Sequence, residues 1–333
     1  MEPCVLTATP MRLLCAVILL HASCAVFAAS GQSASYPDRP IRLIVGFPAG
    51  SNDDYQARII APKLTDRLGQ PVIVDNRSGA AGHLAAEIAA HANPDGHTLM
   101  LAGTLTLASS ITLYPKLGYD LLKDFSYIST VASSPNVLMA HPSVPVKTFK
   151  ELVALIRAKP GVLRYGSAGL ASSGHLAMEL LLSRIGTQLL HVPYKGGAGA
   201  ALALAGGEVQ LGATSIPAGF PLIQSKRVTA LAVTSPKRTA ALPDVPTVAE
   251  SGYPGYDVKN TFGVFAPART PAPVIKRLNT ELRAIVAMED VKARLISQGV
   301  DAGSSTPAEH RALMEAEVVQ WARVVKDAKI TLQ

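Results

Sequence analysis

Cysteine is almost absent from this 333-residue chain, and the three that occur, Cys4, Cys15 and Cys24, all precede residue 28. An apolar run over residues 13–20 follows a single arginine and gives way to small residues ending at Ala28. This pattern is typical of a secretory signal peptide cleaved after about Ala28. The mature chain then has no cysteine, which excludes a disulfide or a thiolate nucleophile and leaves stability to a packed core.

A cleaved signal predicts that the mature protein, which begins after residues 1–28, is periplasmic. A membrane anchor is the alternative, but His21 and Ser23 interrupt the leader and no other segment approaches the roughly 18 apolar residues of a spanning helix. Lipidation of Cys24 is a third possibility, although His21 stands where a lipoprotein signal has leucine.

Aromatic residues are also scarce, at 5% of the chain, while 48% of the residues are hydrophobic and Gly and Pro are frequent. This balance favours an α/β fold with tight connections, and the length is enough for two domains. The formal net charge of +7 can attract small anions, but the basic residues are scattered and form no cluster with aromatics. We therefore expect no nucleic-acid partner.

Signatures of enzymes and metal sites are missing as well. No G-x-S-x-G surrounds Ser167, Ser172 or Ser173, and neither a phosphate-binding P-loop nor a dinucleotide-binding glycine pattern occurs. The eight histidines have no metal-ligand spacing, so we expect no metal and no cofactor. His175 has two readings, a structural role or proton transfer, but no nearby acid is placed to orient it as a base.

Two strand-loop-helix units stand out. In the first, a strand at Ile41–Val45 leads into a loop where Gly50 permits a turn and Ser51, Asn52, Asp53 or Asp54 can cap the next helix. In the second, a strand ending at Tyr165 leads through Gly166 and Gly169 to Ser172 or Ser173. Free N–H groups and hydroxyls at a helix start suit a carboxylate or phosphate. An ordinary connection with a serine cap is the alternative reading.

Strands alternating with helices predict a mostly parallel sheet. Two strands are expected at Tyr127–Ala132 and Asn136–Ala140, separated by a break at 133–135 where the chain crosses between domains. Thr148 and Thr306 are expected to start helices, and the apolar stripe of the last helix predicts core packing. The predicted domains are 36–134 with 259–333, and 135–258.

The chain resembles the Bug-type extracytoplasmic solute receptors, the periplasmic binding proteins of tripartite tricarboxylate transporters. The matching segments are spread in order over nearly the whole mature chain: Tyr36-Pro37-Asp38-Arg39-Pro40-Ile41-Arg42, Gly69-Gln70-Pro71-Val72-Ile73-Val74-Asp75-Asn76-Arg77, Asn93-Pro94-Asp95-Gly96-His97-Thr98-Leu99, Leu122-Lys123-Asp124-Phe125, Tyr165-Gly166-Ser167-Ala168-Gly169, His191-Val192-Pro193-Tyr194-Lys195-Gly196 and Leu242-Pro243-Asp244-Val245-Pro246-Thr247-Val248-Ala249-Glu250-Ser251-Gly252.

The resemblance implies a Venus-flytrap fold of two α/β domains that close on a small carboxylate, with the loops at 47–54 and 166–173 holding it. It implies delivery to membrane transporter subunits and no catalysis, and we expect a monomer. The expected ligand-binding residues are Phe47, Ala49, Gly50, Ser51, Asn52, Asp53, Thr104, Gly166, Ser167, Ala168, Gly169, Ser172, Ser173, His175, Thr214 and Ser215.

The chain departs from the family pattern in two places. The first loop usually reads Phe-Pro-Pro-Gly-Gly-Gly-Thr-Asp, whereas residues 47–54 here have fewer glycines and more polar groups. Thr214 stands where the family commonly has an aspartate, which argues against amino-acid ligands and for a plain carboxylic acid. Two other functions remain: a ligand sensor for a receptor kinase, and a serine-type hydrolase using Ser172 or Ser173 with His175.

Overall fold

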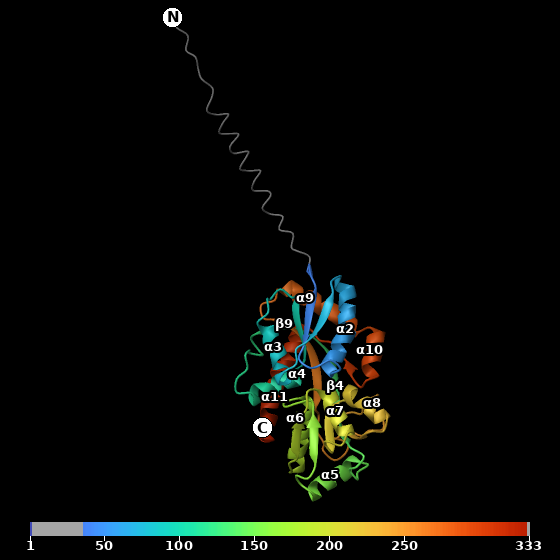
Figure 1. Cartoon of the computed structure of the whole chain (residues 1–333). Helices are drawn as coiled ribbons and strands as arrows, with labels where there is room; N and C mark the ends of the chain where they lie inside the picture. Colours follow the sequence, from blue (N-terminus) through green and yellow to red (C-terminus); the bar gives the residue numbers. More distant parts are fainter. Residues whose placement is uncertain (2–35, 332–333) are drawn as a thin grey trace. The chain divides into compact units, whose positions relative to one another are not determined.

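The computed structural model describes residue 1 and residues 36–331, so the predicted signal peptide and its cleavage site lie outside the described residues. Contacts divide the chain into units 1–38 and 39–333, and every element among the described residues belongs to the second. The elements (Figure 1) are β1 (Ile41–Val45), α2 (Asn52–Leu68), β2 (Val72–Asn76), η1 (Ala80–Gly82), α3 (His83–Ala90), β3 (Thr98–Gly103), α4 (Thr104–Leu113), β4 (Phe125–Ala140), α5 (Phe149–Ala158), β5 (Arg164–Ser167), α6 (Ser173–Ile185), β6 (Leu190–Pro193), α7 (Gly197–Ala205), β7 (Leu211–Ser215), α8 (Ile216–Gln224), β8 (Thr229–Val233), β9 (Lys259–Pro267), α9 (Ala272–Val286), α10 (Glu289–Ile296), β10 (Asp301–Ala302) and α11 (Pro307–Asp327).

The strands form one hydrogen-bonded sheet in the order β2-β1-β3-β9-β4-β7-β5-β6, with β8 and β10 also paired to β4. The flanking strands are parallel, β1 with β2 and β3, and β5 with β6 and β7. The central strands β9 and β4 run antiparallel to their neighbours. The prediction of a mostly parallel sheet therefore holds only for the two flanks, because every pairing of the central strands β4 and β9 is antiparallel.

Strand β4 corrects one prediction. The two strands expected at Tyr127–Ala132 and Asn136–Ala140 are a single strand of 16 residues, which continues through Pro135. Residues up to Pro135 pair with β9, and from Asn136 onward the partners are β7 and β8. Proline has no N–H to donate, and here it lies where the strand changes partners, so the missing donor does not interrupt a continuous ladder.

The caps expected from sequence are present. Thr148 and Thr306 form capping boxes with Glu151 and Glu309 at the starts of α5 and α11. In α11, Met314, Trp321 and Val325 are buried in the main hydrophobic core and Val318 packs against it, which confirms the apolar stripe. α11 packs on α4 and β4, and α9 packs on β4 and α2, so the C-terminal helices cover the half of the sheet that contains β1 to β3.

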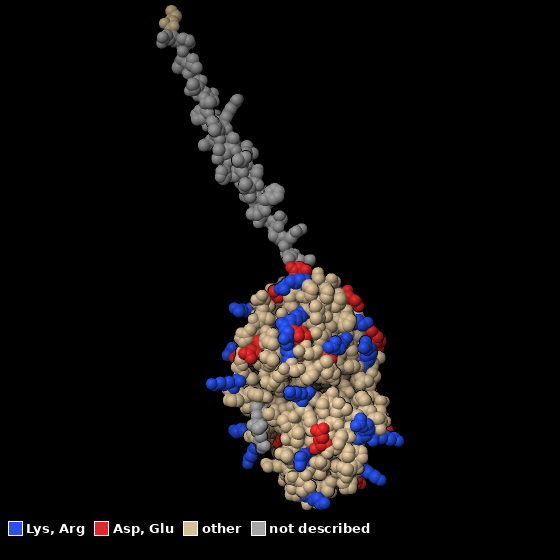
Figure 2. Space-filling model, viewed as in Figure 1, with Lys and Arg blue, Asp and Glu red and all other residues tan. Residues whose placement is uncertain are grey.

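The surface carries no basic cluster on the face drawn in Figure 2, where Lys and Arg are dispersed among acidic residues. Among the described residues, no helix has the length and apolar character needed to cross a membrane. Over the same residues, no group of three His, Cys, Asp or Glu side chains is placed to hold a metal ion.

Candidate functional site

A cavity of about 40 Å³ lies where the two parallel sets of strands meet β4 and β9. Both strand-loop-helix units that the sequence singled out contribute to it. It is lined by Phe47, Ser51, Asn52, Asp53, Thr106, Asn136, Ala168, Ser172, Ser173, Gly174, Gly197, Ala213, Thr214, Ser215, Asn260 and Phe262.

Helix N-termini surround this cavity. α2 and α6 begin at it with Ser51 and Ser172 as their N-caps, and the first residue of α7 and the N-cap of α8 also line it. Each start has backbone N–H groups without helical partners and the positive end of a helix dipole. The cavity is therefore suited to an anion although no Lys, Arg or His is among the described residues that line it.

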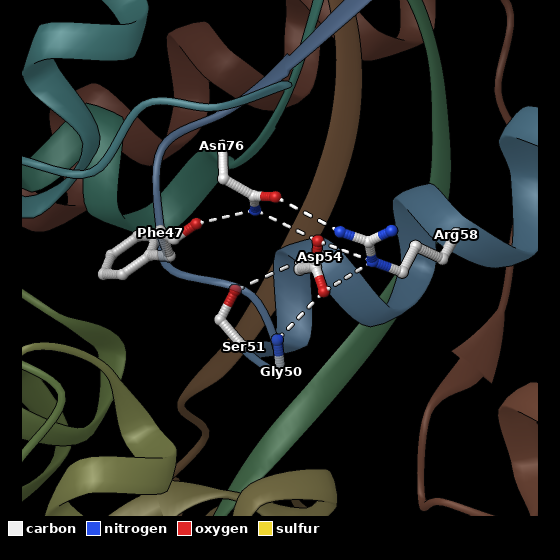
Figure 3. A network of polar contacts seen from close by, with 6 residues as sticks. All are labelled: Phe47, Gly50, Ser51, Asp54, Arg58 and Asn76. Atoms are coloured by element: carbon white, nitrogen blue, oxygen red, sulfur yellow. Dashed lines mark hydrogen bonds and ion pairs between the residues drawn. The ribbon is translucent and has the colours of Figure 1, made fainter. Parts of the chain in front are cut away.

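The first loop is held by a network centred on Asp54 (Figure 3). The Asp54 carboxylate accepts hydrogen bonds from Arg58 Nε at 2.9 and 3.0 Å, from the Gly50 N–H at 2.9 Å and from Asn76 Nδ2 at 3.0 Å. Asn76 Nδ2 also donates to the Phe47 carbonyl at 2.9 Å. Burial acts to raise the pKa of Asp54, but these donors outweigh it and hold the pKa below its usual value. The network fixes the loop that presents Ser51 and Asn52.

Asp53, its neighbour, has a different environment. It is 6% exposed and is the only ionisable side chain among the described residues lining the cavity. Burial raises the pKa of Asp53 to about 7, and bonds from the N–H groups of Asp53 and Gly103 limit that rise. Its carboxyl group can therefore change its protonation state near neutral pH.

The second loop is built around Ser167 at the end of β5. Its hydroxyl lies 2.7 Å from His191 Nε2 and donates to the Gly169 carbonyl at 3.0 Å. Ser172 donates to Ser167 Oγ at 3.3 Å and accepts from the His175 N–H as the cap of α6. These bonds hold the loop so that Ala168, Ser172 and Ser173 face the cavity.

His175 does not line this cavity. Its ring stacks on His191 with centroids 4.2 Å apart, and its Nδ1 accepts a hydrogen bond from the Ala171 N–H. It borders a separate pocket together with Glu179 and His191. Burial lowers the pKa of His175 to about 4, so the ring is neutral at physiological pH and fixes the loop.

The expected ligand-binding residues therefore divide into two groups, and ligand contact stays a prediction for both. The group that lines the cavity is Phe47, Ser51, Asn52, Asp53, Ala168, Ser172, Ser173, Thr214 and Ser215. The group that does not line it is Ala49, Gly50, Thr104, Gly166, Ser167, Gly169 and His175. Thr104, for example, is fully buried and donates to the Thr261 carbonyl, while Thr106, two residues later in α4, reaches the cavity.

Sequence reasoning missed several lining residues, of which Asn136 and Asn260 matter most. The others are Thr106, Gly174, Gly197, Ala213 and Phe262. Asn136 is 1% exposed, and its Nδ2 has no hydrogen-bond partner among the described residues; the same holds for Asn260 Oδ1. A buried amide atom without a partner costs free energy, so both point to a ligand or water in the cavity.

Solved structures share this architecture. The structure of an R. palustris protein with adipate matches with a TM-score of 0.86 at 36% identity, covering 89% of this chain and 99% of that one. MatC from Rhodopseudomonas palustris with bound malate matches with a TM-score of 0.81 at 31% identity, covering 87% and 100%. The fold is that of the two-domain α/β periplasmic binding proteins, which confirms the predicted fold class.

Sequence comparison is more specific. BugT of Bordetella pertussis is 35% identical over 324 residues, 97% of this chain and 99% of that protein. Residues 56–330 match the family described as the tripartite tricarboxylate transporter family receptor, and the chain belongs to this family. The resemblance stated from sequence motifs is thereby confirmed. Members of the family are periplasmic solute-binding receptors.

Proposed function

We propose that this protein is a periplasmic receptor that binds a small organic carboxylate in the cavity and delivers it to a tripartite tricarboxylate-type transporter. The observation that carries the proposal is the convergence of the starts of α2, α6, α7 and α8 on one cavity. N–H groups and hydroxyls there can bind a carboxylate without a basic side chain.

The ligand class is supported by the relatives. One is solved with adipate and another with bound malate, both small dicarboxylates. The unpartnered Asn136 Nδ2 offers one further donor to such a ligand. We also propose that residues 36–134 with 259–333 form one domain, that residues 135–258 form the other, and that the ligand binds between them. The protein is proposed to act as a monomer and to be exported by a signal peptide that is cleaved after about Ala28.

The proposal includes no catalytic step. A hydrolase using Ser172 or Ser173 needs a base within hydrogen-bond reach of the nucleophile. His175 Nδ1 instead accepts from the Ala171 N–H, and the hydroxyls of Ser172 and Ser173 donate to Ser167 Oγ and Asn136 Oδ1. Incubation with carboxylic esters tests this: we expect no hydrolysis above buffer, and turnover abolished by Ser172→Ala would contradict it.

A thermal-shift screen against succinate, malate, adipate and citrate tests the ligand class. A ligand at 100 times its Kd should stabilise the protein by about 2.7 kcal/mol. Equal concentrations of neutral sugars and of a simple diamine, which carry no carboxylate, are the controls. Stabilisation by those controls alone would refute the carboxylate function. A membrane pull-down with and without the stabilising acid then identifies the partner. Capture of a sensor kinase in place of transporter subunits would refute delivery of the ligand to a transporter.

A further inference from the structure

Asp53 and Asp54 are consecutive carboxyls in the first turn of α2, yet only one is neutralised. Arg58 binds both carboxylate oxygens of Asp54, and none of the ion pairs between described residues includes Asp53. Asp53 receives only backbone N–H groups, and it faces the cavity. Arg58 is committed to Asp54 and Asn76, so it leaves Asp53 without a counter-charge.

The elements around the cavity bring no cation to Asp53. Helices α4, α7 and α8 contain no titratable residue, and His175 of α6 is turned toward His191. On β9, Lys259 lies 3.9 Å from Asp257 in an ion pair outside the lining. α11 contributes another acid, Glu317, which is buried but does not line the cavity, and burial raises its pKa to about 7.

A carboxylate ligand and an ionised Asp53 would therefore share a water-poor cavity without a cation between them. Two like charges at close range repel, and low polarity strengthens that repulsion. A neutral Asp53 carboxyl has the opposite effect, because its O–H can donate to a ligand oxygen in a charge-assisted hydrogen bond. The helix starts and Asn136 Nδ2 supply further donors for the same carboxylate.

We propose that Asp53 enters the complex as a neutral carboxylic acid that donates to the ligand carboxylate, so that the receptor takes up one proton from water with each ligand bound when Asp53 is ionised beforehand. The inference rests on the proposed function and adds a residue that couples affinity to pH. The only covalent bond that forms is the O–H bond of Asp53, and its proton comes from solvent.

Titration calorimetry of the full mature protein with succinate, malate and adipate tests the proposal between pH 6.5 and 8.5. The Kd should rise about tenfold for each pH unit above 7, because the unbound Asp53 must first be protonated. Buffers of different ionisation enthalpy should report an uptake approaching one proton per ligand at pH 8.5. A constant Kd, or no proton uptake, overturns the proposal.

Two variants isolate the residue. Asp53→Asn keeps the shape and an N–H donor but cannot ionise, so its Kd should stay constant and at pH 8.5 should be more than tenfold lower than that of the unmodified protein. Asp53→Thr, which restores the family's usual residue, should also bind independently of pH, and it serves if the asparagine variant does not fold. A pH dependence that persists in folded variants overturns the proposal.

Glu317→Gln is the matched control, since Glu317 is a buried acid with its pKa raised to the same range but does not line the cavity. It should retain the full pH dependence of binding. Titration with aspartate tests the opposite assignment, in which an ionised Asp53 pairs with the ammonium group of the ligand. If aspartate binds more tightly than succinate and its affinity increases as pH rises, that assignment holds and the proposal is overturned. If no acid binds either form at any pH, the receptor function fails together with this inference.

Discussion

The hydroxyl of Ser173 donates to the side-chain oxygen of Asn136 at 3.1 Å. This bond joins the first residue of α6 to the point of β4 where the strand changes partners. It also sets the direction of the Asn136 amide, since with the oxygen engaged the unpartnered Nδ2 is the atom left for a ligand. Two residues far apart in sequence thus form one polar unit of the cavity.

Removing this unit should weaken binding. Asn136→Ala should raise the Kd for the bound acid by roughly 10- to 150-fold, because a hydrogen bond to a charged group contributes about 1.5–3 kcal/mol. Ser173→Ala should raise the Kd by a smaller factor, since it releases the amide without deleting it. Calorimetric titration measures both. Ser172→Ala is the contrast: as the cap of α6 it should lower the free energy of unfolding by about 0.5–2 kcal/mol. An unchanged Kd in Asn136→Ala would show that the Asn136 amide does not contact the ligand.

Thr214→Asp should change the ligand class. Thr214 is 1% exposed and lines the cavity at the end of β7. A carboxylate there would repel a ligand carboxylate and offer a partner to an ammonium group, so succinate should bind at least tenfold more weakly while aspartate gains affinity. Thr214→Val controls for loss of the hydroxyl alone. Retained affinity for succinate in Thr214→Asp would show that this position does not face the ligand.

Glu317→Gln should alter the dependence of stability on pH. Burial raises the pKa of Glu317 from 4.5 to about 7, so the folded state holds this proton more tightly than the unfolded state between those pH values. The wild-type protein therefore loses stability as pH rises through that window, and the variant escapes this loss. Relative to wild type, the variant should gain on the order of 3 kcal/mol between pH 4.5 and 8. Denaturant unfolding at both pH values measures the difference, and a variant whose stability relative to wild type increases as pH falls would contradict it.

Gly174→Ala should disturb both stability and binding. A Cβ at Gly174 would overlap the Ala213 carbonyl oxygen, so α6 would have to move away from β7. Such overpacking costs about 1–3 kcal/mol and would displace the serines at the start of α6. Gly199→Ala is the control, because its Cβ would meet only Tyr194 Cβ, at an ordinary 3.8 Å. Denaturant unfolding and calorimetric titration of both variants test this prediction. Equal free energies of unfolding and equal Kd values for the two variants would argue against the close contact at Gly174.

The local features of the site could be predicted from sequence because they depend on neighbours in the chain. Ser51 and Ser172 cap helices directly after the loops that the sequence singled out. Asn136 and Asn260 could not be found this way. β9 brings Asn260 opposite Ser134 of β4, a pairing between segments more than a hundred residues apart. Pro135, read as a break, hid the continuity of β4 that places Asn136 in the cavity.

The absence of basic side chains among the described cavity-lining residues has an evolutionary consequence. Backbone N–H donors at helix starts are retained in almost any single substitution, whereas an arginine that binds a carboxylate is lost when that one residue is replaced. Substitutions at positions such as Asp53, Asn136 and Thr214 can then redirect the protein to a different acid while its grip on the carboxylate persists. Proteins with this cavity can therefore change their ligand through single substitutions without an intermediate that binds no carboxylate.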